Sequence, residues 1–268
     1  TLNYKFFCNM LLREEISVDD LYAAIGKLEI ISITLDQGDN AQLIFESLNS
    51  TGLALTEGDK IRNYILMGLP PKDQNKYYDN YWAKIEKCTD KDVSGFIRDY
   101  MSVKQQITPT ISNVYRAFKE YAENARLPID TLLTDILRYA RFYEKLLICK
   151  SGLKEQKLDD CLYRMMRLEI VVTRPFLMEV LRLNQDGKLT VDDVLQIFLI
   201  TENYLFRRNI CEVPTNALNK IFLNLNKEIL RYDNTADQYV AKFIYALRSK
   251  KESGRFPDDE ESTEALAS

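Results

Sequence analysis

Apolar residues recur three and four positions apart along most of the chain after the double proline Pro70-Pro71, and this period leaves little freedom in the choice of fold. It is the period of a helix that buries one face. Glycine and proline are scarce, with 9 and 7 among 268 residues, and such a composition disfavours a turn-rich β architecture. The sequence therefore predicts a mainly α fold whose largest part is a multi-helical domain.

Start and stop signals divide this region into helices. Thr190 with Asp193 predicts a capped helix start, and so does Thr108 followed by Pro109. Pro175 predicts a break just before it, because proline removes a helical hydrogen bond. The other helices are expected over residues 72–88, 92–103, 129–149, 158–184, 217–230 and 237–248. Their aromatic residues fall at helical spacing, which favours a packed core over a stacking platform for bases or a cofactor.

The N-terminal part of the chain has a different pattern. Helices are expected over residues 2–12 and from Ser17 to Gly26. A strand is expected over residues 27–36, where β-branched residues are frequent. Because one strand is not stable alone, its partners are expected upstream of Thr1, in another chain or in a short hairpin.

Residues 39–70 are expected to form two helices around a polar loop. Gly52 can close the first helix through a positive φ. Thr56 can cap the second, and Asp59 completes a weak capping box. Polar groups near the loop come from Asn49, Asp59, Arg62 and Asn63. Such a loop can bind a ligand, and it can equally be a well-capped turn.

Composition excludes several classes of function. The chain has no histidine, which removes most zinc sites and every Ser-His-Asp or Cys-His nucleophile system. The net charge of −4, without an evident basic patch, argues against strong DNA binding by this chain alone. Five cysteines without a C-x-x-C pair fit free thiols in a reducing compartment. With no apolar run of ~18 residues and no signal peptide, the sequence predicts a cytoplasmic protein.

The string FESLNSTGLALTEGDKIRN at residues 45–63 resembles the signature that ends the N-terminal domain of GmrSD-type, modification-dependent restriction endonucleases. Lys60 and Gly58 depart from the family pattern, which usually has an aliphatic residue at position 60. Weaker similarities are FIRDY at 96–100, VYRAFKEY at 114–121, YLFRRNICEVPT at 204–215 and GRFPDDEE at 254–261. The resemblance covers most of the chain.

The resemblance implies that residues 1–70 are the C-terminal part of a small α/β, ParB-like domain. It implies a helical domain over 71–253 and an acidic, solvated tail over 254–268 that leads towards a missing nuclease region. The implied function is that of a fragment of a prokaryotic, nucleotide-dependent restriction endonuclease in antiphage defence. The family's Asp-Gly-Gln-Gln-Arg motif is absent from this chain, and its His-Asn-His nuclease needs histidine.

The chain alone is therefore expected to be inactive and to need no cofactor. The full-length protein is expected to bind DNA and to use a nucleoside triphosphate and Mg²⁺. The alternative interpretation is a non-catalytic helical scaffold that binds a protein partner or itself.

Candidate site residues follow from the same resemblance. Those for nucleotide binding are Asn49, Gly52, Asp59, Arg62 and Asn63. In this interpretation Arg62 contacts phosphate oxygens, and Asp59 orients Arg62 or binds a Mg²⁺-linked water. Arg207 and Arg208 are candidate contacts to DNA phosphates, with pairing to Glu202 or Glu212 as the structural alternative. No catalytic or metal-ligating residue is proposed.

Overall fold

The computed structural model describes residues 2–13, 17–30, 32, 34, 55–231 and 238–267. The chain divides into two compact units, Thr1–Ala41 and Gln42–Ser268, which are described separately. The boundary predicted at residue 70 falls inside the second unit. In the described residues the protein is mainly helical, as the sequence predicts.

The first unit contains two short helices, α1 (Leu2–Leu12) and α2 (Val18–Ile25). Ser17 caps α2, because its hydroxyl accepts a hydrogen bond from the backbone N–H of Asp20 at 3.0 Å. Both helices agree with the sequence prediction. Within this unit neither helix encloses a core, and α2 has no buried residue.

The predicted strand over residues 27–36 is not seen where the structure describes this stretch. Lys27 lies in a turn, and residues 28–30, 32 and 34 have no regular structure. The rest of the stretch lies outside the described residues. β-Branched composition favours a strand only where a neighbouring strand accepts its hydrogen bonds, and the described residues supply none. The α/β character implied for residues 1–70 is therefore absent from the described part.

The second unit is built entirely from helices in its described residues. Its longer helices are α4 (Glu57–Leu66), α5 (Pro71–Tyr77), α6 (Ala83–Cys88), α7 (Val93–Gln105), α8 (Val114–Ala125), α9 (Ile129–Leu147), α10 (Gln156–Arg167), α11 (Arg174–Gln185), α12 (Val191–Ile210), α13 (Leu218–Ile229), α14 (Tyr239–Arg248) and α15 (Asp259–Ala267). A π-helical turn, η1 (Tyr78–Trp82), joins α5 to α6. Short 3₁₀ turns are η2 (Ile111–Asn113), η3 (Val171–Thr173), η4 (Thr215–Ala217) and η5 (Glu252–Gly254).

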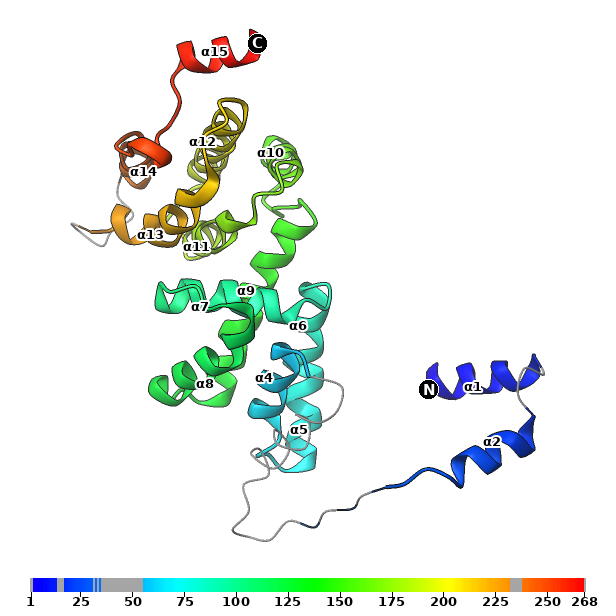
Figure 1. Ribbon diagram of the computed structural model, residues 1–268. Coiled ribbons are helices and arrows are strands. Elements are labelled where there is room, and N and C mark those ends of the chain that lie inside the picture. The colour runs from blue at the N-terminus through cyan, green and yellow to red at the C-terminus, as the bar shows by residue number, and fades with distance from the viewer. Residues whose placement is uncertain are drawn as a thin grey trace. The chain divides into compact units, whose positions relative to one another are not determined.

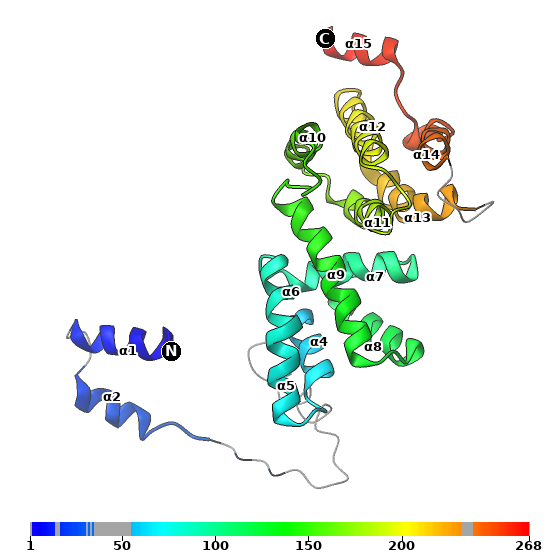
Figure 2. The same ribbon diagram turned by 180° about the vertical axis from the view of Figure 1, so that it is seen from behind.

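Two helices hold this unit together. The long helix α9 packs on α6, α7 and α11, and α11 packs in turn on α12 and α13 (Figures 1 and 2). Aromatic side chains fill the interior, as predicted: the rings of Phe96 and Tyr143 lie 5.4 Å apart, and those of Phe176 and Phe243 stack at 5.5 Å. The sequence prediction of a packed aromatic core is confirmed.

Most helix ends that the sequence predicts from capping residues and prolines are found in the structure. Thr190 and Asp193 form a complete capping box at the start of α12. Pro175 lies in the first turn of α11, so the predicted break before it is confirmed. Thr108 does not cap a helix: its hydroxyl accepts a hydrogen bond from the Ser102 hydroxyl at 2.9 Å, and the next helix, α8, begins only at Val114.

The acidic C-terminal segment is helical, and most of its residues are exposed, as expected for a solvated tail. Residues from Asp259 to Ala267 form α15, which packs on α12. Asp258 stabilises its start by accepting a hydrogen bond from the backbone N–H of Glu261 at 2.9 Å. Acidic residues in a first turn favour a helix because they face the positive end of its dipole. The acidic composition thus marks a helix N-terminus.

Gly58 lies at the contact between α4 and α7. Its backbone N–H donates to the Ser94 hydroxyl at 3.0 Å, and a Cβ added there would meet the Val93 Cβ at 2.9 Å. This close packing explains a glycine inside the first turn of a helix.

We therefore expect Gly58→Ala to cost about 1–2 kcal/mol through overpacking, despite the better helix propensity of alanine. Differential scanning calorimetry should show a melting temperature lowered by about 4 °C. Gly68→Ala is the matched control, because a Cβ there would meet nothing within 4 Å. Equal melting temperatures for the two variants would contradict the packing argument.

Candidate functional site

Three of the five candidate nucleotide-binding residues lie on α4, and Asn49 and Gly52 lie outside the described residues. Thr56 and Asp59 form the predicted capping box. The Thr56 hydroxyl accepts from the Asp59 backbone N–H at 3.1 Å, and Asp59 Oδ2 accepts from the Thr56 backbone N–H at 3.3 Å. Asn63 follows one turn later and is half-buried. Asp59 therefore stabilises the N-terminus of α4.

Arg62 connects α4 to α6. Its guanidinium lies 3.1 Å from Asp59 Oδ1 and 3.3 Å from Glu86 Oε1. Glu86 Oε1 also accepts a hydrogen bond from the Trp82 indole at 2.9 Å, and Glu86 Oε2 accepts one from the Tyr78 hydroxyl at 3.3 Å. The Arg62 side chain remains 30% exposed, so part of the guanidinium faces solvent while the rest is held in this network. This arrangement fixes the position of Arg62 relative to the helical region.

The surroundings of Asp59 do not fit a Mg²⁺ ion. Oδ2 accepts hydrogen bonds from the backbone N–H and the hydroxyl of Thr56, and Oδ1 lies beside the Arg62 guanidinium. The adjacent guanidinium would also repel a cation. Across the described ranges, no group of three or more His, Cys, Asp or Glu side chains could hold a metal ion.

Arg208, a candidate DNA contact, is buried with 2% of its surface exposed. Its guanidinium donates to the backbone carbonyls of Pro214 at 2.6 Å, Ser253 at 2.8 Å and Arg255 at 3.1 Å. Burial lowers the pKa of Arg208, yet arginine stays charged at neutral pH. Arg208 therefore tethers residues 253–255 to α12, and its guanidinium is out of reach of a DNA phosphate in this structure.

Arg207, the neighbouring candidate, points into an open cavity instead. Its guanidinium lies 2.5 Å from Asp259 Oδ1 and donates to the Pro257 carbonyl at 3.2 Å. Neither Glu202 nor Glu212 is its partner, since Glu202 pairs with Arg164. Arg207 is thus the accessible member of the arginine pair.

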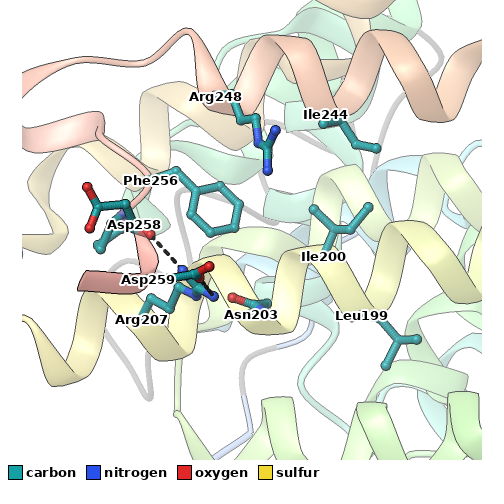
Figure 3. Close-up of a pocket in the computed structure, with 10 residues that line it drawn as sticks. Leu199, Ile200, Asn203, Arg207, Ile244, Arg248, Phe256, Asp258 and Asp259 are labelled. Carbon is teal, nitrogen blue, oxygen red and sulfur yellow. Dashed lines mark hydrogen bonds and ion pairs between the residues drawn. The ribbon is translucent and has the colours of Figure 1, made fainter. Parts of the chain in front are cut away.

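The cavity has a volume of about 520 Å³ and lies between α12, α14 and the segment that leads into α15 (Figure 3). Ile200, Asn203 and Arg207 come from α12, Ile244 and Arg248 from α14, and Phe256 from the connecting segment. Within the described part of the chain, the Arg248 guanidinium makes no hydrogen bond or ion pair. Figure 3 shows the side chains of Arg207, Arg248 and Phe256 turned towards the same space. We call this space the α12–α14 cavity.

A second cavity, of about 560 Å³, contains an unusual carboxyl group. Asp99 on α7 is half-buried and makes no hydrogen bond or ion pair to another described residue. Burial raises its pKa to about 7, although the guanidinium groups of Arg174 and Arg98 oppose that rise. Arg174 itself donates to the Tyr143 hydroxyl at 3.0 Å. Asp99 is therefore a carboxyl group that changes charge near neutral pH.

Sequence reasoning missed both cavities. The residues around Arg248 and Phe256 form no motif that predicts a site. These two side chains reach Arg207 through the packing of α14 and of residues 254–258. Asp99 lies inside the FIRDY string, but nothing in that string reveals its burial. The thiols follow expectation, since all five cysteines are free, and burial together with Glu144 raises the pKa of Cys88 to about 11.

Comparisons with known proteins add no relative. No protein-family model, no curated protein and no solved structure matches the chain. In the part of the chain that the structure describes, no helix is long and apolar enough to cross a membrane.

Proposed function

We propose that this chain is a non-cleaving part of a prokaryotic, nucleotide-dependent restriction endonuclease that acts in the cytoplasm in antiphage defence. The observation that carries the proposal is the string at residues 45–63, which resembles the GmrSD-type signature. Its second half is a capped helix whose Asp59 and Arg62 lie side by side. Residues 1–70 would then close a ParB-like domain, and the nucleotide, Mg²⁺ and DNA would engage the full-length protein.

In this proposal Arg62 couples a ligand bound near the N-terminus of α4 to the helical region. Arg62 lies in the second turn of α4, and its guanidinium bridges to Glu86 on α6. A ligand phosphate near the N-terminus of α4 would compete with Glu86 and Asp59 for the Arg62 guanidinium, because a guanidinium can donate two parallel hydrogen bonds to phosphate oxygens. Release of Glu86 would loosen the contact between α4 and α6.

We expect Arg62→Ala in the full-length protein to lower phage restriction and nucleotide hydrolysis at least about tenfold, a barrier change of about 1.4 kcal/mol. The melting temperature should fall by no more than about 3 °C, because partly exposed ion pairs contribute about 1 kcal/mol or less. Plaque assays with phages that carry modified and unmodified DNA measure the first effect.

Lys60→Ala is the matched control, since Lys60 lies on the same helix and, among the described residues, pairs only with Glu57, at 2.7 Å. It should leave restriction unchanged. If Arg62→Ala lost activity only in proportion to lost stability, Arg62 would be a structural residue. If neither the wild-type protein nor the control restricted any phage, the endonuclease proposal would fail.

The second candidate function is a helical scaffold that binds a protein partner or itself. It is favoured by the first unit, where Tyr4, Phe6, Phe7 and Leu12 are 70%, 58%, 56% and 80% exposed. Several large apolar side chains exposed on one short helix favour an interaction surface. Concentration-dependent self-association in analytical ultracentrifugation, combined with no phage restriction, would favour the scaffold over the endonuclease.

A further inference from the structure

We propose that the α12–α14 cavity binds a phosphate ester that carries a flat, apolar group, as a nucleotide does, and that Asp259 occupies the phosphate position while the ligand is absent. The volume of about 520 Å³ lies within the range of small-molecule sites. The site involves none of the α4 residues, so it stands whether or not the chain belongs to a restriction endonuclease.

Two guanidinium groups supply the charge for an anion. Arg248 is exposed and has no partner among the described residues, so its five N–H donors remain available. Arg207 is held from one side by the Pro257 carbonyl at 3.2 Å, which keeps its guanidinium at the cavity wall. The two arginines come from different helices and face one space (Figure 3). Guanidinium groups bind phosphate oxygens in pairs of parallel hydrogen bonds.

The cavity also offers apolar surface beside these charges. Ile200 and Ile244 line it from opposite helices, and the Phe256 ring lies 6.0 Å from the Arg207 guanidinium carbon. The same ring is held by Tyr204, with the ring centroids 5.1 Å apart. An aromatic face beside arginines accepts a nucleobase by stacking, independently of base identity. Inorganic phosphate would use only the charged half of this site.

Asp259 has the properties of an internal competitor. Its side chain is 91% exposed, so leaving Arg207 costs it little burial. By contrast, Asp258 accepts the backbone N–H of Glu261 and is committed to the start of α15. A phosphate monoester carries nearly twice the charge of a carboxylate at neutral pH. Such a ligand therefore displaces Asp259 from Arg207 without unfolding α15.

The test is isothermal titration calorimetry of the full chain with three probes: AMP, inorganic phosphate and a short oligothymidylate. We expect AMP to bind with a Kd below about 1 mM and at least about tenfold more tightly than phosphate. Arg248→Gln should weaken AMP binding about tenfold or more at an unchanged melting temperature, because Arg248 supports no other described residue. Arg116→Gln is the matched control, since Arg116 is 73% exposed on α8.

Asp259→Asn tests whether Asp259 competes with the ligand for Arg207 or instead helps to form the site. If Asp259 competes with the ligand, the variant should bind AMP about three- to tenfold more tightly than the wild type, since it removes one opposing charge. Weaker binding in this variant would overturn the competitor role. Absence of AMP and oligonucleotide binding at millimolar concentration, or equal effects of Arg248→Gln and Arg116→Gln, would overturn the site. Binding of the oligonucleotide alone would support it and identify the phosphate ester as part of a nucleic-acid strand.

Discussion

Arg208→Ala is expected to lower the melting temperature by about 10 °C. The variant removes the donor for three carbonyls, those of Pro214, Ser253 and Arg255. A buried acceptor without a partner costs about 1–3 kcal/mol, and neighbouring groups relax together, so the total should be about 3–5 kcal/mol. Because only 2% of the Arg208 surface is exposed, water can reach the three carbonyls only where the structure opens locally.

Arg207→Ala supplies a control one residue away. Its guanidinium binds the exposed Asp259 and one carbonyl, which together contribute about 1 kcal/mol and about 3 °C of melting temperature. Circular dichroism melts of both variants at one pH make the comparison. Equal shifts would mean that the buried hydrogen bonds of Arg208 add nothing beyond those of the partly exposed Arg207, and Arg208 would not tether residues 253–255.

The arginine pair also shows where sequence reasoning stops. Helical spacing places Arg208 on the buried face of α12 with Tyr204 and Leu205, and Arg207 lies ~100° away from it. The spacing does not show what the two guanidinium groups bind. Most of their partners come from residues 253–259, about fifty positions later, which offer carbonyls to Arg208 and a carboxylate to Arg207. No local pattern contains that information.

Features that depend on neighbouring residues were predictable. The capping boxes at Thr56 and Thr190, the break before Pro175 and the buried aromatic faces all follow from contacts within a few positions. Predictions failed where the local structure depends on a residue outside the pattern or on a strand that the described residues do not supply. Thr108 binds Ser102 instead of capping a helix, and the described residues of the expected strand have no neighbouring strand.

The second large effect concerns pH. Stability of the wild-type chain is expected to fall as the pH rises from about 4 to about 8, and Asp99→Asn is expected to remove most of that fall. The folded state raises the pKa of Asp99 to about 7, so it binds a proton that the unfolded chain has already lost near its ordinary value of 3.8. Stability from the protonated carboxyl is therefore complete below the unfolded pKa and is lost as the pH passes the folded pKa. Each pKa unit corresponds to about 1.4 kcal/mol.

The charged groups around Asp99 do not reverse this direction. Arg174 and Arg98 favour its ionised form and Asp92 disfavours it, while burial remains the largest influence. Because the side chain is only half-buried, we expect about 2 kcal/mol, below the full value of the pKa change. Asp159 and Asp186 have lowered pKa values, so their contributions are lost only below the ordinary aspartate range. The two windows therefore do not overlap.

Thermal melts of wild type and Asp99→Asn at pH 4.5 and pH 8 separate these contributions. At pH 8 the variant should melt about 5 °C higher than the wild type, since asparagine keeps the size of the side chain without the buried charge. At pH 4.5 the two should differ by less than about 2 °C, because both side chains are neutral in the folded state. A variant that is less stable than the wild type at pH 8 would show that Asp99 serves as an ionised partner of Arg174, and the raised pKa would be wrong. If the melts match both expectations, ionisation of Asp99 accounts for the loss of stability between pH 4.5 and pH 8.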